Sequence, residues 1–121
     1  MTNLYYTVPY TTIHNLAEIG FIEGSYKEFD FNIYNSTSTS LLTIWGCTLT
    51  WSLYHLEDIL DYPEIEKTVY PYSSTSFQVV LSSSDTEGLY GKFIQEVTIT
   101  DYVGKNFTGG RGLVTILPSA L

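Results

Sequence analysis

The chain alternates hydrophobic and polar residues in several short runs, which is the period of a β-strand with one face in a core. The clearest runs are 27–35, 47–55, 76–82 and 90–100. The inward residues expected from them are Phe29, Phe31, Ile33, Leu49, Trp51, Leu53, Phe77, Val79, Leu81, Phe93, Val97 and Ile99. Gln95 is a polar residue at an inward position of the longest run. The pattern predicts strands and no long amphipathic helix.

Weaker segments complete the predicted strands. Residues 19–24 are expected to form a short first strand, and 67–72 an extended segment that Pro71 places at a sheet edge or in a bend. The acidic stretch 56–66 predicts a long loop with one helical turn at 56–61. The last strand is expected at 113–117.

Turn residues mark the connections between the strands. In 82–89, Asp85 is expected to bond to nearby backbone amides and Gly88 to supply a free φ. In "DYVGK" at 101–105, Gly104 predicts a hairpin turn. The glycines of "GGRG" at 109–112 predict a break in the last strand.

Seven or eight short antiparallel strands in 121 residues favour an all-β, immunoglobulin-like sandwich as the single domain, spanning 19–121. Trp51 resembles the core tryptophan of that fold. A jelly roll or a small barrel is the alternative. Residues 1–18 are aromatic but lack a steady period, and they are expected to form an N-terminal arm. The arm could dock on the body or on a neighbouring subunit, and the neighbour is favoured.

The composition of the chain limits the classes of partner that we expect. The formal charge is −8, and the five basic residues include no adjacent pair. Nucleic acid and anionic membrane surfaces both need clustered cations, so neither is an expected partner. No stretch approaches the roughly 20 apolar residues of a membrane span. The N-terminus lacks the pattern of a signal peptide, so we expect the protein to stay in a cytoplasm or leave it inside a larger particle.

Candidate chemistry is sparse. His55, Glu57 and Asp58 form the one cluster of such residue types, and a zinc site would need further ligands. A solvated loop is the expectation there, and a loose calcium site in 57–66 is the alternative. No Gly-x-Ser-x-Gly elbow is present, so no nucleophilic triad is predicted. Cys47 is expected to be a small buried residue, with a reactive thiol as the alternative. We expect no catalytic residue, cofactor or metal.

The order of several segments resembles a known family. These are "FIEGSYKEFDFNIYN", "GCTLTWSL", "FQVVLSSSDTEGLYGKFIQEVTITDYVGK" and "GLVTILP", which together cover about residues 19–118. They resemble the N-terminal immunoglobulin-like module of phage baseplate upper proteins and small virion proteins of gut phages. The resemblance implies a non-enzymatic module that attaches a larger assembly to the virion, often beside copies of itself.

The functional hypothesis is therefore a structural virion protein of a tailed phage, made in the bacterial host cytoplasm. It would dock in the tail or baseplate, or decorate the capsid as an auxiliary or head-fibre protein. The expected partners are other virion proteins, in multiple copies or as a homo-oligomer. With 11 tyrosines in the chain, the proposed contact residues are Tyr5, Tyr6, Tyr10, Tyr62, Tyr70 and Tyr72. The alternative is a carbohydrate- or cell-surface-binding module, and an enzyme using His14 or His55 is a third class.

Overall fold

The protein is nearly all β. The computed structural model describes residues 3–9, 14–16, 18–34, 44–57 and 62–120. Its strands are β1 Asn3–Pro9, β2 His14–Asn15, β3 Ile19–Ile22, β4 Lys27–Tyr34, β5 Thr48–His55, β6 Ile65–Val69, β7 Ser76–Leu81, β8 Gly91–Thr100 and β9 Asn106–Leu117. One short helix, α1 Ser83–Thr86, lies between β7 and β8.

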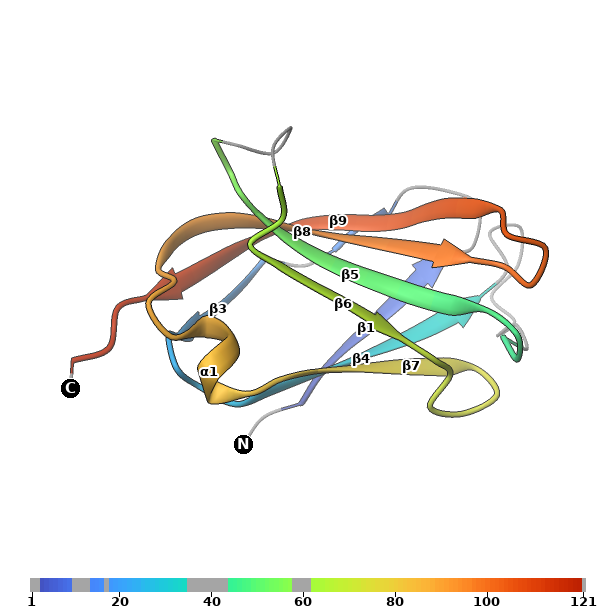
Figure 1. Cartoon of the computed structure of the whole chain (residues 1–121), viewed down its shortest axis with the longest axis horizontal. Coiled ribbons are helices and arrows are strands. Elements are labelled where there is room, and N and C mark those ends of the chain that lie inside the picture. The colour runs from blue at the N-terminus through green and yellow to red at the C-terminus, as the bar shows by residue number, and fades with distance from the viewer. Residues whose placement is uncertain (1–2, 10–13, 17, 35–43, 58–61, 121) are drawn as a thin grey trace.

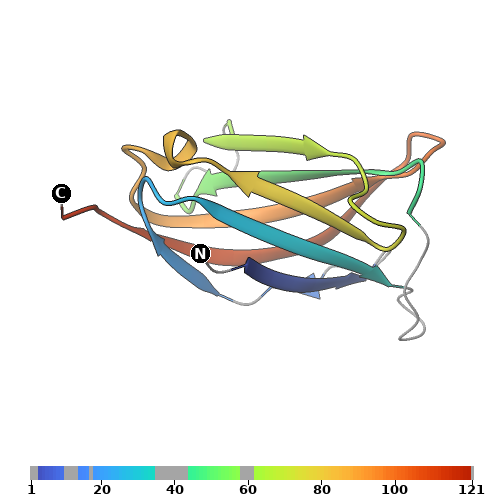
Figure 2. The same ribbon diagram turned by 90° about the horizontal axis from the view of Figure 1, so that it is seen from below.

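The strands form two sheets that pack face to face (Figures 1 and 2). The first sheet has the order β1-β4-β7. The second has the order β2-β9-β8-β5-β6, with β3 also paired to β9. This arrangement confirms the predicted all-β sandwich.

The three N-terminal strands depart from the expected antiparallel order. β1 pairs parallel with β4, and β2 and β3 each pair parallel with β9. Alternation along a strand fixes which side chains face inward but carries no information on direction, so the sequence could not show this. A parallel partner must also lie far along the chain, because it needs a crossover connection.

Residues 3–9 lie within the segment that the sequence analysis assigned to an arm, and they form strand β1. Their backbone is in register with β4 from Asn3 opposite Glu28 to Pro9 opposite Tyr34. Aromatic and β-branched residues suit such a strand, and Pro9 stands at its end, where a lost backbone donor is tolerated. Whether residues 1–18 also reach a neighbouring subunit stays a prediction.

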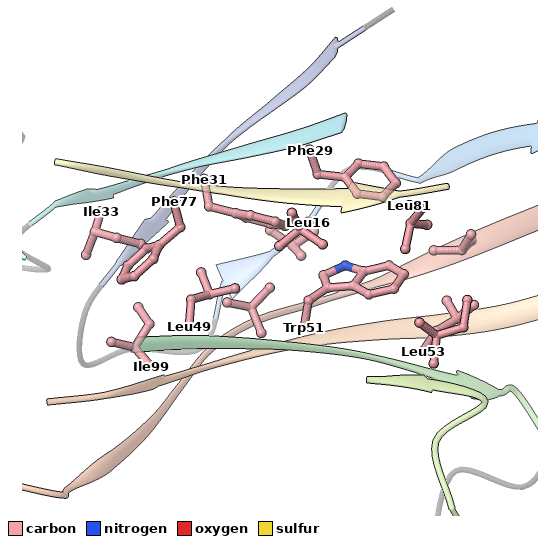
Figure 3. Close-up of a cluster of buried hydrophobic side chains, with 14 of the residues drawn as sticks. Leu16, Phe29, Phe31, Ile33, Leu49, Trp51, Leu53, Phe77, Leu81 and Ile99 are labelled. Atoms are coloured by element: carbon pink, nitrogen blue, oxygen red, sulfur yellow. The ribbon is translucent and has the colours of Figure 1, made fainter. Parts of the chain in front are cut away.

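The core lies between the two sheets and contains every inward residue that the alternation predicted. All twelve are fully buried, and Figure 3 shows eight of them labelled around Trp51. Leu16, Phe21, Ile44, Cys47, Ile65, Val114 and Ile116 complete the buried hydrophobic set. The alternation along each strand therefore places the inward side chains of both sheets in one continuous apolar layer.

Gln95, the polar residue at an inward position, is fully buried beside Trp51. The indole Nε1 of Trp51 donates a hydrogen bond to Gln95 Oε1 at 2.7 Å. The Trp51 ring also stacks on Phe29 of the opposite sheet, with 5.5 Å between ring centroids. The glutamine thus supplies the acceptor that a buried indole N–H requires.

The predicted break at 109–112 is wrong, because β9 runs without interruption through these glycines. Opposite Val97 and Thr98 the register steps from Gly110 to Thr108, so Gly109 is accommodated as a β-bulge. Gly112 has a different role. A Cβ there would lie 2.8 Å from the Leu16 carbonyl oxygen and 2.9 Å from the Leu16 Cβ. Glycine allows the segment that follows β2 to lie directly against β9.

The corner at 82–89 forms one turn of helix, α1, where the sequence analysis expected a turn. Asp85 Oδ2 accepts a hydrogen bond from the backbone N–H of Ser82 at 2.7 Å, as predicted for this aspartate. Asp85 also pairs with Lys67 of β6 at 3.1 Å. Gly88 follows with a φ of 82°. The helical turn predicted at 56–61 falls largely outside the described residues.

Replacing Gln95 by leucine should destabilise the fold by about 1–3 kcal/mol, because the buried indole N–H of Trp51 loses its acceptor. Urea denaturation would measure the loss. The matched control is Gln78→Leu, since the Gln78 amide bonds to Asp30 Oδ1 at 3.1 Å outside the core. We expect the control to lower the free energy of unfolding by less than half as much as Gln95→Leu does. Equal decreases in the two variants would contradict the role given to Gln95. In the double variant Trp51→Phe with Gln95→Leu, the two losses should be less than additive.

Gly112→Ala should destabilise the protein by about 1–3 kcal/mol, because the new methyl group meets the backbone of Leu16 and not a flexible side-chain end. Gly20→Ala in β3 is the control, since a Cβ there would lie at an ordinary 3.5 Å from the Thr115 carbonyl oxygen. Its stability should stay within about 0.5 kcal/mol of wild type. Thermal and urea unfolding would measure the stability of both variants. Similar losses of stability in the two would show that Leu16 does not pack tightly against Gly112.

The Asp85 carboxylate should make stability depend on acid pH. The backbone N–H of Ser82 lowers the pKa of Asp85 most; partial burial opposes it, and Lys67 and the Ser82 hydroxyl add to the lowering. A lowered native pKa stabilises the fold above the unfolded pKa, and that contribution disappears as pH falls through the native value. Asp85→Asn should therefore be less stable than wild type near neutral pH, and the two should converge in acid. A difference in stability between Asp85→Asn and wild type that does not change with pH would contradict the role given to this carboxylate.

Candidate interaction surface

Three loops meet at one end of the sandwich. They are the segment 44–47 before β5, the loop 70–75 between β6 and β7, and the turn 101–105 between β8 and β9. The backbone N–H of Ile44 bonds to the Ser74 carbonyl at 2.9 Å, which joins the first loop to the second. A Cβ on Gly46 would lie 3.3 Å from the Tyr102 Cβ, which places the third loop beside the first. All three lie at the right-hand end in Figures 1 and 2.

These loops present large apolar side chains to solvent. The exposed fractions are Trp45 59%, Tyr70 78%, Tyr72 68%, Tyr102 79% and Val103 64%. We call these five residues the aromatic end. Single exposed hydrophobic residues are ordinary on a protein surface, but a group of them on adjoining loops is typical of an interaction site.

Hydrogen bonds within the loops fix their shape. Asp101 Oδ1 accepts from the backbone N–H groups of Val103 at 3.0 Å and Lys105 at 2.9 Å. Gly104 closes this turn with a φ of 90°, as the sequence predicted. In the neighbouring loop the hydroxyls of Ser73 and Ser76 lie 2.7 Å apart. The backbone that carries the aromatic side chains is therefore held in place by hydrogen bonds.

Cys47 lies behind the aromatic end and is buried, which confirms the expected small core residue. Burial raises the pKa of its thiol, the nearby Asp101 carboxylate raises it further, and a backbone hydrogen bond at Tyr102 acts in the opposite direction. A raised pKa leaves little thiolate at neutral pH, so the group is poorly suited to nucleophilic chemistry.

The proposed contact residues divide between different regions. Tyr70 and Tyr72 belong to the aromatic end and do not pack into their own domain. Tyr62 precedes β6, so it lies at the opposite end of the sandwich, where it is 85% exposed. The backbones of Tyr5 and Tyr6 lie in β1 opposite Asp30 and Phe31.

Tyr10 falls outside the described residues, and contact of any of the six tyrosines with a partner stays a prediction. The sequence analysis missed Trp45, Tyr102 and Val103. Large apolar residues beside turn glycines, in "WGC" and "DYVGK", were the available signal.

The opposite end carries the histidine that the sequence analysis considered. His55 Nε2 lies 3.3 Å from Glu64 Oε1, and both side chains are more than a third exposed. The His55 ring stacks on Phe93 at 4.6 Å between centroids. A hollow of about 500 Å³ beside it is lined by His55, Leu56, Glu57, Tyr90, Gly91 and Lys92. This is the geometry of an exposed histidine–glutamate contact on a packed ring, while Asp58 lies outside the described residues.

A second polar arrangement at that end is structural. The Glu23 carboxylate accepts from the backbone N–H of Gly88 at 2.8 Å and of Ser119 at 2.9 Å. The N–H of Gly24 donates to the buried Thr86 Oγ1 at 2.9 Å. These bonds tie the turn after β3 to α1 and to the chain beyond β9, so the carboxylate already has partners.

The described residues contain no group of three or more metal-ligating side chains placed around one point. Within the same ranges, no helix is long and apolar enough to cross a membrane. Neither statement reaches residues 58–61, which lie inside the acidic loop considered for calcium.

The fold and the surface together define a two-sheet β-sandwich domain with an aromatic loop end. Among solved structures, the chain is similar to the N-terminal domain of phage TP901-1 ORF48, with a TM-score of 0.64 and 12% sequence identity. The likeness covers 97% of this chain and 99% of that one, so the two share their fold over essentially their whole length. No model of a protein family matches the chain, and no curated protein does.

Proposed function

We propose that this protein is a structural component of a tailed-phage virion, where it acts as a non-enzymatic docking module. The observation that carries the proposal is the fold shared with the N-terminal domain of a phage protein over 97% of this chain. The segment order that resembles baseplate upper proteins was recognised from sequence and supports the same class. A fold alone does not assign a function, so the proposal also depends on what the surface offers.

The surface offers contacts suited to assembly. The aromatic end exposes five large apolar side chains on ordered loops. The outer edges of the two sheets, β1, β6 and β7 among them, could accept strands of a neighbour. With several copies in a particle, contacts of modest affinity would hold by multivalency. The net charge of −8 disfavours adhesion to the packaged DNA.

The proposed partners are other virion structural proteins and further copies of this chain. The family resemblance favours the tail or baseplate as the location. Decoration of the capsid, as an auxiliary or head-fibre protein, is the second location we propose to test. The competing function is a carbohydrate- or cell-surface-binding module, and the exposed aromatic rings of the aromatic end are the observation that favours it.

Immunogold electron microscopy tests the proposal. Particles purified from the source on a density gradient should bind antibody raised against this protein, whereas pre-immune serum should leave them unlabelled. Gold at the tail tip would support the baseplate location, and gold over the head would support decoration. Particles that package normally but carry no gold would refute the virion role and leave the carbohydrate-binding function as the better one.

A further inference from the structure

We propose that the aromatic end is the docking surface of this module and that it binds an uncharged, apolar patch on a partner virion protein. This inference rests on the proposed function, which it deepens by naming the surface and the chemistry of the partner. Two other candidate sites among the described residues are the His55 hollow and the Glu23 carboxylate. The hollow adjoins undescribed residues, and the carboxylate is already bonded to two backbone amides.

The loops of the aromatic end carry no net charge. Among residues 44–47, 70–75 and 101–105, Asp101 and Lys105 are the charged ones, and their charges cancel. The chain as a whole has 13 acidic and five basic residues, so this neutral end contrasts with an acidic body. A charged ligand therefore finds no excess of opposite charge in these loops. The centres of protein interfaces are depleted of charge and enriched in aromatic residues, which is the composition seen here.

The polar groups of these loops favour a protein partner over a sugar. A sugar site needs polar side chains aimed at the hydroxyl groups of the ligand, beside the aromatic rings. At this end several of the polar side chains bond within their own loop or turn. Asp101 Oδ1 holds two amides of its turn, and Asn106 Oδ1 accepts from the Thr100 hydroxyl at 2.7 Å. The backbone N–H of Thr75 donates to Ser73 Oγ at 3.4 Å.

The polar atoms that shape the loops thus bond to one another, whereas the aromatic rings and Val103 are exposed to solvent. An apolar protein patch is the better fit to such a surface. The tyrosine hydroxyls suit the wet rim of a protein interface, where the ring packs and the hydroxyl stays solvated.

The aromatic end is preorganised for binding. Tyrosine and tryptophan have few rotatable bonds, so ordering them on binding costs little entropy. The bond between Ile44 and Ser74 and the Asp101 turn already hold the loops in place. Less of the favourable contact energy is then offset by the entropy lost when the loops are ordered, so a small surface can still bind with useful affinity.

The experiment measures binding of the purified chain to phage particles produced without it. Co-sedimentation gives the affinity of wild type, of the double variant Trp45→Ser with Tyr102→Ser, and of a control. The control is Tyr62→Ser with Tyr90→Ser, whose rings are 85% and 59% exposed at the opposite end. All these side chains are exposed, so both variants should fold, and their thermal unfolding would be recorded first.

We expect the aromatic-end variant to bind at least about tenfold more weakly, as is typical when two central aromatic contacts are removed. The control should stay within about threefold of wild type, since surface changes outside an interface have small effects. Because the surface carries no net charge, raising NaCl from about 0.05 to 0.5 M should change the affinity less than about threefold.

Three results would overturn the inference while leaving the virion role intact. If the aromatic-end variant binds the particles as tightly as wild type, the docking surface lies elsewhere. Binding abolished by periodate oxidation of the particles would identify a glycan partner. Self-association that is lost in the variant while particle binding is retained would identify a second copy as the occupant. Absence of wild-type binding to the particles would instead contradict the proposed function itself.

Discussion

The hydrogen bond from Trp51 Nε1 to Gln95 Oε1 is the constraint around which the sandwich is arranged. It joins β5 to β8 inside the core, and the same indole stacks on Phe29 of the other sheet. A buried donor without an acceptor would cost more than most single contacts contribute, so the two residues must face each other. This requirement fixes the relative position of β5 and β8 within the larger sheet.

The N-terminal strands close one side of this sandwich. β1 extends the smaller sheet beside β4, and β2 and β3 then extend the larger sheet beside β9. Figure 2 shows these blue strands along the same side. Covering both sheets with one segment protects the β4 and β9 edges from pairing with other chains. The arrangement depends on Gly112, because a side chain there would hold Leu16 away from β9.

The two ends of the sandwich differ in chemistry. One end is tied by polar groups: Glu23 and Thr86 bind backbone amides, and His55 lies beside Glu64. The other end satisfies its polar groups within the loops and exposes rings. In the proposed docking role, the apolar end would contact the partner, and the acidic body would discourage unspecific contacts among copies.

The sequence by itself determined the local features. Alternation identified all the inward residues of four strands, because a period of two leaves each side chain only one of two faces. Residue type also identified Asp85, Gly88 and Gly104 as turn residues, because the interactions that form a turn are short-range and need no distant partner.

Tertiary structure decided what depends on residues far apart in the chain. The direction of β1, β2 and β3, the acceptor role of Gln95 and the uninterrupted path of β9 through its glycines were of this kind. So was the meeting of Trp45, Tyr70 and Tyr102 at one end, because three loops separated in sequence become neighbours only once the two sheets have packed.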